Sequence, residues 1–147
     1  MNVPSAAAHR EPMYCQRILL IDDEPGFTAL LKAGLERIGN YQVVFCNEPN
    51  RALRIALEFQ PDAILLDVMM PGRDGSDLYR EMAAHPILRR IPKIMLTALV
   101  GSQEVASHGY AKSGDMILMA KSMALHRIHH CLLQVLAGNL RCSEAAA

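Results

Sequence analysis

The sequence lacks the signals that would tie the chain to a membrane, a secretory route or a disulfide framework. No apolar run in its 147 residues approaches the roughly 18 residues that a membrane-spanning helix needs. The N-terminal segment does not have the basic-then-apolar order of a secretory signal. The four cysteines form no CxxC pair and no metal-binding spacing, which favours free thiols in a reducing compartment. We therefore expect a cytoplasmic protein without membrane insertion.

The sequence also lacks a charge excess. Its 15 basic and 15 acidic residues give a formal net charge of zero, so nothing predicts direct binding to nucleic acid. A Gly-rich phosphate loop and a dinucleotide fingerprint are absent as well, which argues against a nucleotide-binding enzyme. What remains is a globular composition, 51% hydrophobic and 20% charged, with enough residues for one domain and a substantial core.

The two ends of the sequence differ from its middle. Residues 1–14 are mostly small or polar and include two prolines, which predicts a disordered N-terminal extension. Residues 139–147 have a similar character and predict a C-terminal tail. Residues 15–138 contain no internal repeat and no low-complexity linker, so they predict one domain. Because no sequence is left for a DNA-binding output domain, we expect a stand-alone protein.

Strand-like and helix-like segments alternate through the middle of the chain. Short aliphatic runs and 3.6-residue periods predict, in order, strand 17–21, a helix from Pro25, strand 41–46, a helix capped by Asn47, strand 63–66, a helix capped by Asp74 or Ser76, strand 91–96, a weaker helix near 102–112, strand 116–119 and helix 123–136. This alternation predicts an α/β fold, a parallel five-stranded sheet covered by helices on both faces.

Polar residues follow several of these strands directly. Asp22 and Asp23 follow the first strand, and Asp67 follows the third. The carboxyl ends of parallel strands meet at one edge of a sheet, where ligands bind. Clustered carboxylates repel unless a cation neutralises them, and Mg²⁺ suits oxygen ligands. Thr97 follows the fourth strand and Lys121 closely follows the fifth, so several chain segments bring polar groups to the same edge.

Each of these residues also has a simpler interpretation. An aspartate in such a place is typical of a helix cap or a turn, and Thr97 alone fits an ordinary strand end. Lys121 alone fits a solvated side chain. Lys112 is a competing site lysine, but its place before a Ser-Gly turn fits a helix end better. Glu24 is interpreted as a nearby charge rather than a ligand. The combination, not any single residue, predicts a cation-holding site.

Four motifs in order resemble the CheY-like receiver domain of two-component response regulators. They are Ile-Leu-Leu-Ile-Asp-Asp-Glu-Pro at 18–25, Ile-Leu-Leu-Asp-Val-Met-Met-Pro-Gly-Arg-Asp-Gly at 64–75, Pro-Lys-Ile-Met-Leu-Thr-Ala at 92–98 and Ala-Lys at 120–121. The likeness covers roughly residues 17–138. Each motif is weak alone, but the ordered combination is specific.

The resemblance implies a flavodoxin-like (βα)5 fold with strand order 2-1-3-4-5. It implies a phosphoacceptor signalling domain rather than an enzyme, although such a domain can promote its own phosphorylation and dephosphorylation. A sensor histidine kinase or a histidine phosphotransfer protein would phosphorylate Asp67, and an unidentified downstream protein would respond. Thr97 and Lys121 would contact phosphoryl oxygens. The implied Mg²⁺ ligands are Asp22, Asp23, Asp67 and the backbone carbonyl of Met69.

The sequence departs from the family pattern near the expected signalling face. Ser122 follows Lys121, where the family usually has a proline after a cis peptide. A cis bond before serine costs ~2.5–4 kcal/mol, which favours a trans peptide and a less firmly held lysine, although the isomer stays open. Leu118 replaces the aromatic residue of the usual switch, and the segment between Thr97 and Lys121 is about two residues longer than usual. Hydrophobic neighbours of the site at 69 and 99 predict slow loss of the phosphoryl group.

Three functions compete at this point. The first is a phosphorylated receiver that acts as a switch or as a phosphorelay intermediate. The second is a degenerate receiver that binds partners independently of phosphorylation. The third, an Asp-nucleophile phosphatase, is disfavoured because Met69 stands where such enzymes have a second aspartate. The oligomeric state, monomer or homodimer, stays open.

Overall fold

A computed structural model describes residues 14–98, 111–113 and 116–138. Its strands are β1 (Gln16–Ile21), β2 (Tyr41–Cys46), β3 (Ala63–Asp67), β4 (Lys93–Thr97), β5 (Ala111–Ser113) and β6 (Met116–Ala120). Its helices are α1 (Pro25–Ile38), α2 (Ala52–Phe59), α3 (Gly75–Ala84) and α5 (Leu125–Leu136), with short 3₁₀ turns η2 (Pro49–Arg51) and η3 (Leu88–Arg90). Among the described residues, no helix is long and apolar enough to cross a bilayer.

The strands form one sheet in the order β2-β1-β3-β4-β6-β5. All pairs from β2 to β6 are parallel, which confirms the predicted flavodoxin-like sheet and its strand order. The short strand β5 was not predicted; it pairs antiparallel with β6 at the edge. The prediction of a helix near 102–112 was therefore wrong for Ala111 and Lys112, because pairing with β6 outweighs local helix preference there. Residues 102–110 lie outside the described residues.

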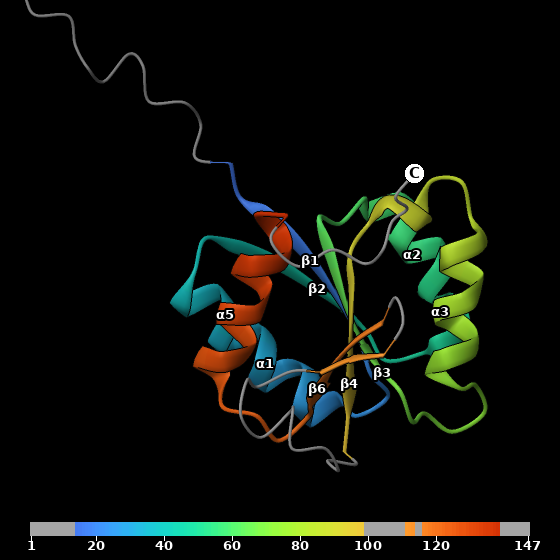
Figure 1. Cartoon of the computed structure of the whole chain (residues 1–147). Coiled ribbons are helices and arrows are strands. Elements are labelled where there is room, and N and C mark those ends of the chain that lie inside the picture. The colour runs from blue at the N-terminus through green and yellow to red at the C-terminus, as the bar shows by residue number, and fades with distance from the viewer. Residues whose placement is uncertain (1–13, 99–110, 114–115, 139–147) are drawn as a thin grey trace, which may run out of the picture.

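Helices cover both faces of the sheet, as the sequence predicted. Helices α1 and α5 lie on one side, and α2 and α3 lie on the other (Figure 1). Successive residues of β1 point to opposite faces, so Ile18 and Leu20 join the core under α1 and α5. Leu19 and Ile21 join the core under α2 and α3. Burial on both faces explains why this strand reads as an unbroken aliphatic run.

Two helix starts follow local rules and a third does not. Pro25 opens α1, and the Asp74 carboxylate caps α3 by accepting a hydrogen bond from the Ser76 backbone N–H at 2.8 Å. The predicted Asn47 cap of α2 was wrong. Pro49 begins a 3₁₀ turn ahead of α2, and the Asn47 side chain turns instead toward the loop that follows β1. This loop carries part of the candidate site.

The described cysteines are buried or partly buried free thiols. Cys46 lies in the core under α2 and α3, and Cys131 lies in the core under α1 and α5. Burial raises the pKa of Cys131 to about 12, so its thiol stays protonated and unreactive near neutral pH. Cys15 is partly exposed, and Cys142 lies outside the described residues.

Candidate functional site

The site lies at the carboxyl edge of the sheet, where β1 and β3 end side by side. In the register of this pair Ile21 faces Leu66, so the next residues, Asp22 and Asp67, lie at the same level, with Asp67 as the last residue of β3. One carboxylate oxygen from each of Asp22, Asp23 and Asp67 lies within 4.8 Å of the others. The structure therefore brings together the three acidic residues that the sequence predicted as ligands.

Two of these carboxylates are buried without full compensation. Asp67 is only 2% exposed, and Asp22 is fully buried. Among the described residues, Asp22 Oδ2 and Asp67 Oδ2 have no hydrogen-bond partner. Burial, together with the neighbouring Asp22 carboxylate, raises the pKa of Asp67 to about 6. Burial likewise raises the pKa of Asp22. Both shifts show that ionising the pair is costly in the absence of a cation.

This donor set fits Mg²⁺. The ion prefers oxygen ligands and is commonly held by one or two carboxylates together with water. Asp22 Oδ2 and Asp67 Oδ2, which have no hydrogen-bond partner, supply such ligands from inside the protein, and the partly exposed Asp23 adds a third. The carbonyl of Met69 stays a predicted fourth ligand. Its backbone N–H faces Asp67 Oδ1 at 3.3 Å, so the chain turns back over the carboxylate directly after β3.

A glycine at the start of α3 lets the loop after β3 pack closely against that strand. A Cβ atom on Gly75 would lie 2.0 Å from the Asp67 carbonyl oxygen and 2.8 Å from Val68 Cα. The Gly75 N–H also donates to the Val68 carbonyl at 2.9 Å. Any larger residue would push the loop away from Asp67. The sequence motif contained this glycine, but its packing role depends on a contact that only the fold reveals.

Lys121 reaches the acidic cluster from the loop after β6. Its Nζ lies 2.8 Å from Asp22 Oδ2, 3.5 Å from Asp67 Oδ2 and 2.7 Å from Glu24 Oε1. Burial alone would lower the pKa of Lys121, but these three carboxylates outweigh it and raise the pKa, so the lysine remains charged. The described residues contain no cis peptide, so the bond before Ser122 is trans.

The prediction of a less firmly held lysine stays a prediction, but the structure gives Lys121 several contacts. The Lys121 side chain is only 12% exposed, and its backbone N–H donates to the Thr97 carbonyl at 2.7 Å. The ring centroid of Phe27 lies 4.7 Å from Nζ. The loop after β1, helix α1 and strand β4 therefore all contact this lysine, although the proline that the family usually has is missing.

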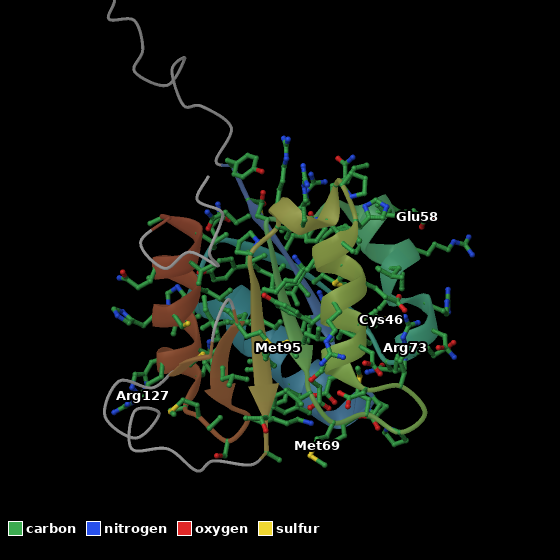
Figure 2. The ribbon with its side chains drawn as sticks, turned by 45° about the vertical axis from the view of Figure 1, so that its right-hand side comes forward. Cys46, Glu58, Met69, Arg73, Met95 and Arg127 are labelled. Atoms are coloured by element: carbon green, nitrogen blue, oxygen red, sulfur yellow. The ribbon has the colours of Figure 1, made fainter. Side chains whose placement is uncertain are left out.

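Thr97 and Met69 lie at the carboxyl ends of two neighbouring strands, β4 and β3. Thr97 ends β4 in register with Ala120, so it lies next to the segment that carries Lys121. Its predicted contact with a phosphoryl oxygen stays a prediction. Met69 is 58% exposed and projects outward beyond the ends of the strands (Figure 2). Residue 99, the other predicted hydrophobic neighbour, lies outside the described residues.

Sequence reasoning missed the part that Asn47 plays. Its side-chain amide donates to the Asp22 carbonyl at 2.7 Å and to Thr28 Oγ1 at 3.0 Å. Thr28 is fully buried and its hydroxyl faces the Pro25 carbonyl at 3.1 Å. The end of β2 is thus tied to the loop that carries two of the three carboxylates. No local pattern around Asn47 signals this, because its partners lie in another part of the chain.

Comparison with known proteins now decides the family. The family model described as the response regulator receiver domain matches residues 18–132, most of the chain. The chain belongs to this family. The receiver is 42% identical over 85 residues to the response regulator PleD of Caulobacter vibrioides (strain NA1000 / CB15N), covering 58% of this chain and 18% of PleD. It is 37% identical over 83 residues to the alkaline phosphatase synthesis transcriptional regulatory protein PhoP of Bacillus subtilis (strain 168), covering 56% of this chain and 33% of PhoP.

Solved structures agree with this assignment along nearly their whole length. The signal receiver domain of a signal transduction histidine kinase from Syntrophus aciditrophicus has a TM-score of 0.69 and 30% identity, covering 90% of this chain and 98% of that one. The N-terminal domain of a response regulator receiver protein from Methanoculleus marisnigri JR1 has a TM-score of 0.61 and 28% identity, covering 84% and 98%. The receiver spans a third or less of the curated relatives above, but nearly all of these structures.

Proposed function

We propose that this receiver accepts a phosphoryl group on Asp67 from a sensor histidine kinase or a histidine phosphotransfer protein, and that the modification changes which downstream protein it binds. The observation that carries the proposal is the gathering of three carboxylates, two of which are buried and form ion pairs with the charged Lys121. A carboxylate kept in such surroundings is a reactive group rather than a structural one.

The chemistry requires that an anionic carboxylate approach an anionic phosphoryl group. A bound Mg²⁺, held by Asp22, Asp23 and Asp67, would reduce this repulsion. The three carboxylates, one divalent cation and Lys121 have a formal sum of zero charge. An Asp67 carboxylate oxygen then forms a bond to phosphorus as the bond from phosphorus to the donor's histidine nitrogen breaks, and the imidazole leaves. The product is a mixed anhydride, a labile group suited to a resettable signal.

The phosphoryl group would create new acceptors next to existing donors. It adds a large negative charge and three oxygens at the edge where Thr97 and Lys121 lie. Hydrogen bonds to charged groups contribute ~1.5–3 kcal/mol each. Two such bonds are comparable with the ~5.5 kcal/mol that moves a two-state equilibrium from 1:99 to 99:1. A local event at Asp67 is therefore large enough to shift the conformation of the domain.

A hollow between α1 and α5 is a candidate binding position for the protein that donates the phosphoryl group. It has a volume of about 520 Å³ and shares Phe27 and Lys121 with the site. Its outer wall includes Leu30, whose side chain is 75% exposed. We propose that an apolar helix face of the donor seats here, because continuity with Lys121 would bring its histidine toward Asp67. Leu30→Glu should then slow phosphotransfer from the donor protein and leave phosphorylation by acetyl phosphate unchanged.

Incubation with acetyl phosphate and Mg²⁺, followed by intact mass measurement, tests the proposed function. Wild type should gain one phosphoryl mass, and Asp67→Ala should gain none. Asp74→Ala is the matched control, because that carboxylate caps α3 and lies outside the metal cluster. Failure of wild type to react, together with failure to bind Mg²⁺ and beryllofluoride, would favour the alternative of a degenerate receiver. Leu118, which replaces the aromatic residue of the usual switch, is compatible with that alternative. We also expect a long acyl-phosphate half-life, because the hydrophobic Met69 side chain flanks the approach of water.

A further inference from the structure

In the metal-free protein Lys121 is engaged by a carboxylate outside the proposed metal site. Its Nζ donates a hydrogen bond to Glu24 Oε1 at 2.7 Å. Nζ also forms an ion pair with Asp22 Oδ2 at 2.8 Å, and Asp67 Oδ2 is farther away at 3.5 Å. The ammonium group of Lys121 is therefore shared between Glu24, outside the cluster of three aspartates, and the buried Asp22.

Glu24 and Phe27 together form an outer seat for the ammonium group. Glu24 is the residue before α1, and its side chain makes no capping hydrogen bond to that helix. Phe27 lies one turn later, with its ring centroid 4.7 Å from Nζ. Both residues thus lie on the α1 side of Lys121, whereas Asp67 comes from β3. The outer seat, formed by Glu24 and Phe27, therefore competes with a phosphorylated Asp67 for the ammonium group of Lys121.

We propose that Glu24 is a resting-state latch, a positioning residue that holds Lys121 on the rim until a phosphoryl group on Asp67 outcompetes it. The inference rests on the proposed function, because it needs a phosphoryl group at Asp67. It gives Glu24 a role that a nearby charge alone would not have. Without phosphorylation, the contact between Glu24 and Lys121 disfavours the conformation that phosphorylation would stabilise. If this contact is weakened, Lys121 should bind the phosphoryl oxygens more readily.

The size of the effect follows from exposure. The Glu24 side chain is 63% exposed, so its ion pair with Lys121 is screened by water. Exposed pairs of this kind change an equilibrium by about two- to fivefold. The latch is therefore a fine adjustment of the switch, and removal of Glu24 should not abolish phosphorylation.

Affinity for beryllofluoride in saturating Mg²⁺ tests the latch, because this anion mimics a phosphoryl group on a carboxylate. Four proteins are compared: wild type, Glu24→Gln, Glu24→Asp and Glu58→Gln. Glutamine removes the charge but keeps the shape. Aspartate keeps the charge but withdraws the carboxylate by one methylene. Glu58 is the matched control, since it is an equally exposed helix glutamate paired with Arg54 at 3.0 Å. Thermal unfolding confirms that all four are folded.

The latch predicts that Glu24→Gln and Glu24→Asp both bind beryllofluoride about two- to fivefold more tightly than wild type, while Glu58→Gln does not differ. Tighter binding by Glu24→Gln alone would indicate general charge repulsion and would overturn the latch. Unchanged or weaker binding by Glu24→Gln would overturn it as well, as would a gain in Glu58→Gln. If wild type itself does not bind, the proposed function fails and the latch with it; if wild type binds normally, only the latch is in question.

Discussion

The two ends of β3 hold an aspartate each, and the two residues are in opposite conditions. Asp62, just before the strand, accepts hydrogen bonds on both oxygens, from the Tyr14 hydroxyl at 2.9 Å and from the Arg17 backbone N–H at 2.7 Å. Asp67, at the end of the strand, has one buried oxygen without a partner and a raised pKa. The same residue type is fully hydrogen-bonded at one end and has a buried oxygen without a hydrogen-bond partner at the other, and the proposed function makes the second one the reactive group.

Two lysines repeat the contrast at the same two edges of the sheet. Lys93, at the start of β4, is 3% exposed and donates to the Leu88 and Ile91 carbonyls at 2.8 and 2.7 Å. Lys121, after β6, faces carboxylates instead. Neutral carbonyl acceptors at the amino edge give Lys93 a fixed structural role. Charged acceptors at the carboxyl edge give Lys121 the partners for which, in the proposed function, a metal or a phosphoryl group would compete.

The largest expected effect on stability comes from replacing Lys93 at the amino edge of the sheet. Lys93→Ala removes the hydrogen bonds that the lysine donates to the Leu88 and Ile91 carbonyls, as well as its contact with the Tyr79 ring. We expect a loss of about 2–4 kcal/mol in the free energy of unfolding. Urea denaturation measures it. Acetyl phosphate should still label the folded fraction, and a loss of labelling in folded protein would contradict the separation of the two edges.

At the carboxyl edge, a substitution is expected to raise the free energy of unfolding rather than lower it. Folding raises the pKa of Asp67 from 3.8 to about 6, so its contribution to stability is fully present below the unfolded pKa and is lost as pH rises through about 6. Asp67→Asn removes this cost and should stabilise the metal-free protein near neutral pH by about 1–3 kcal/mol. Urea denaturation without Mg²⁺, repeated down to pH 4, checks it. The gain should shrink as pH falls, and a pH-independent gain would contradict the explanation.

A smaller effect, on Mg²⁺ affinity, is expected from the hydrogen bonds by which Asn47 connects the end of β2 to the loop that carries Asp22 and Asp23. Asn47→Ala removes the hydrogen bonds to the Asp22 carbonyl and to Thr28, and should weaken Mg²⁺ binding severalfold by loosening the two carboxylates on that loop. Asn40→Ala is the control, because its side chain donates to the Tyr14 carbonyl at the other edge. Calorimetric Mg²⁺ titration compares the two. Equal affinities in both variants and wild type would show that the tie has no influence on the site.

The contrast also shows what the sequence could reveal. The strands and the acidic trio were predictable, because an aliphatic run followed by a carboxylate is a local pattern whose place in a parallel sheet is fixed by topology. The contacts of Asn47 lie 19 and 25 residues away, and the Glu24–Lys121 pair spans 97 residues. Strand β5 exists through its pairing with β6. Such features depend on how segments meet, and neither propensity nor period encodes them.

Titration of the isotope-labelled protein with Mg²⁺, followed by amide chemical shifts, tests the central claim most directly. The account predicts saturable shifts that involve the ends of β1 and β3 together, at Asp22, Asp23 and the residues after Asp67, and their loss in Asp22→Asn. Shifts that never saturate, or that spread over exposed acidic side chains and persist in Asp22→Asn, would show that the three carboxylates do not form one cation site.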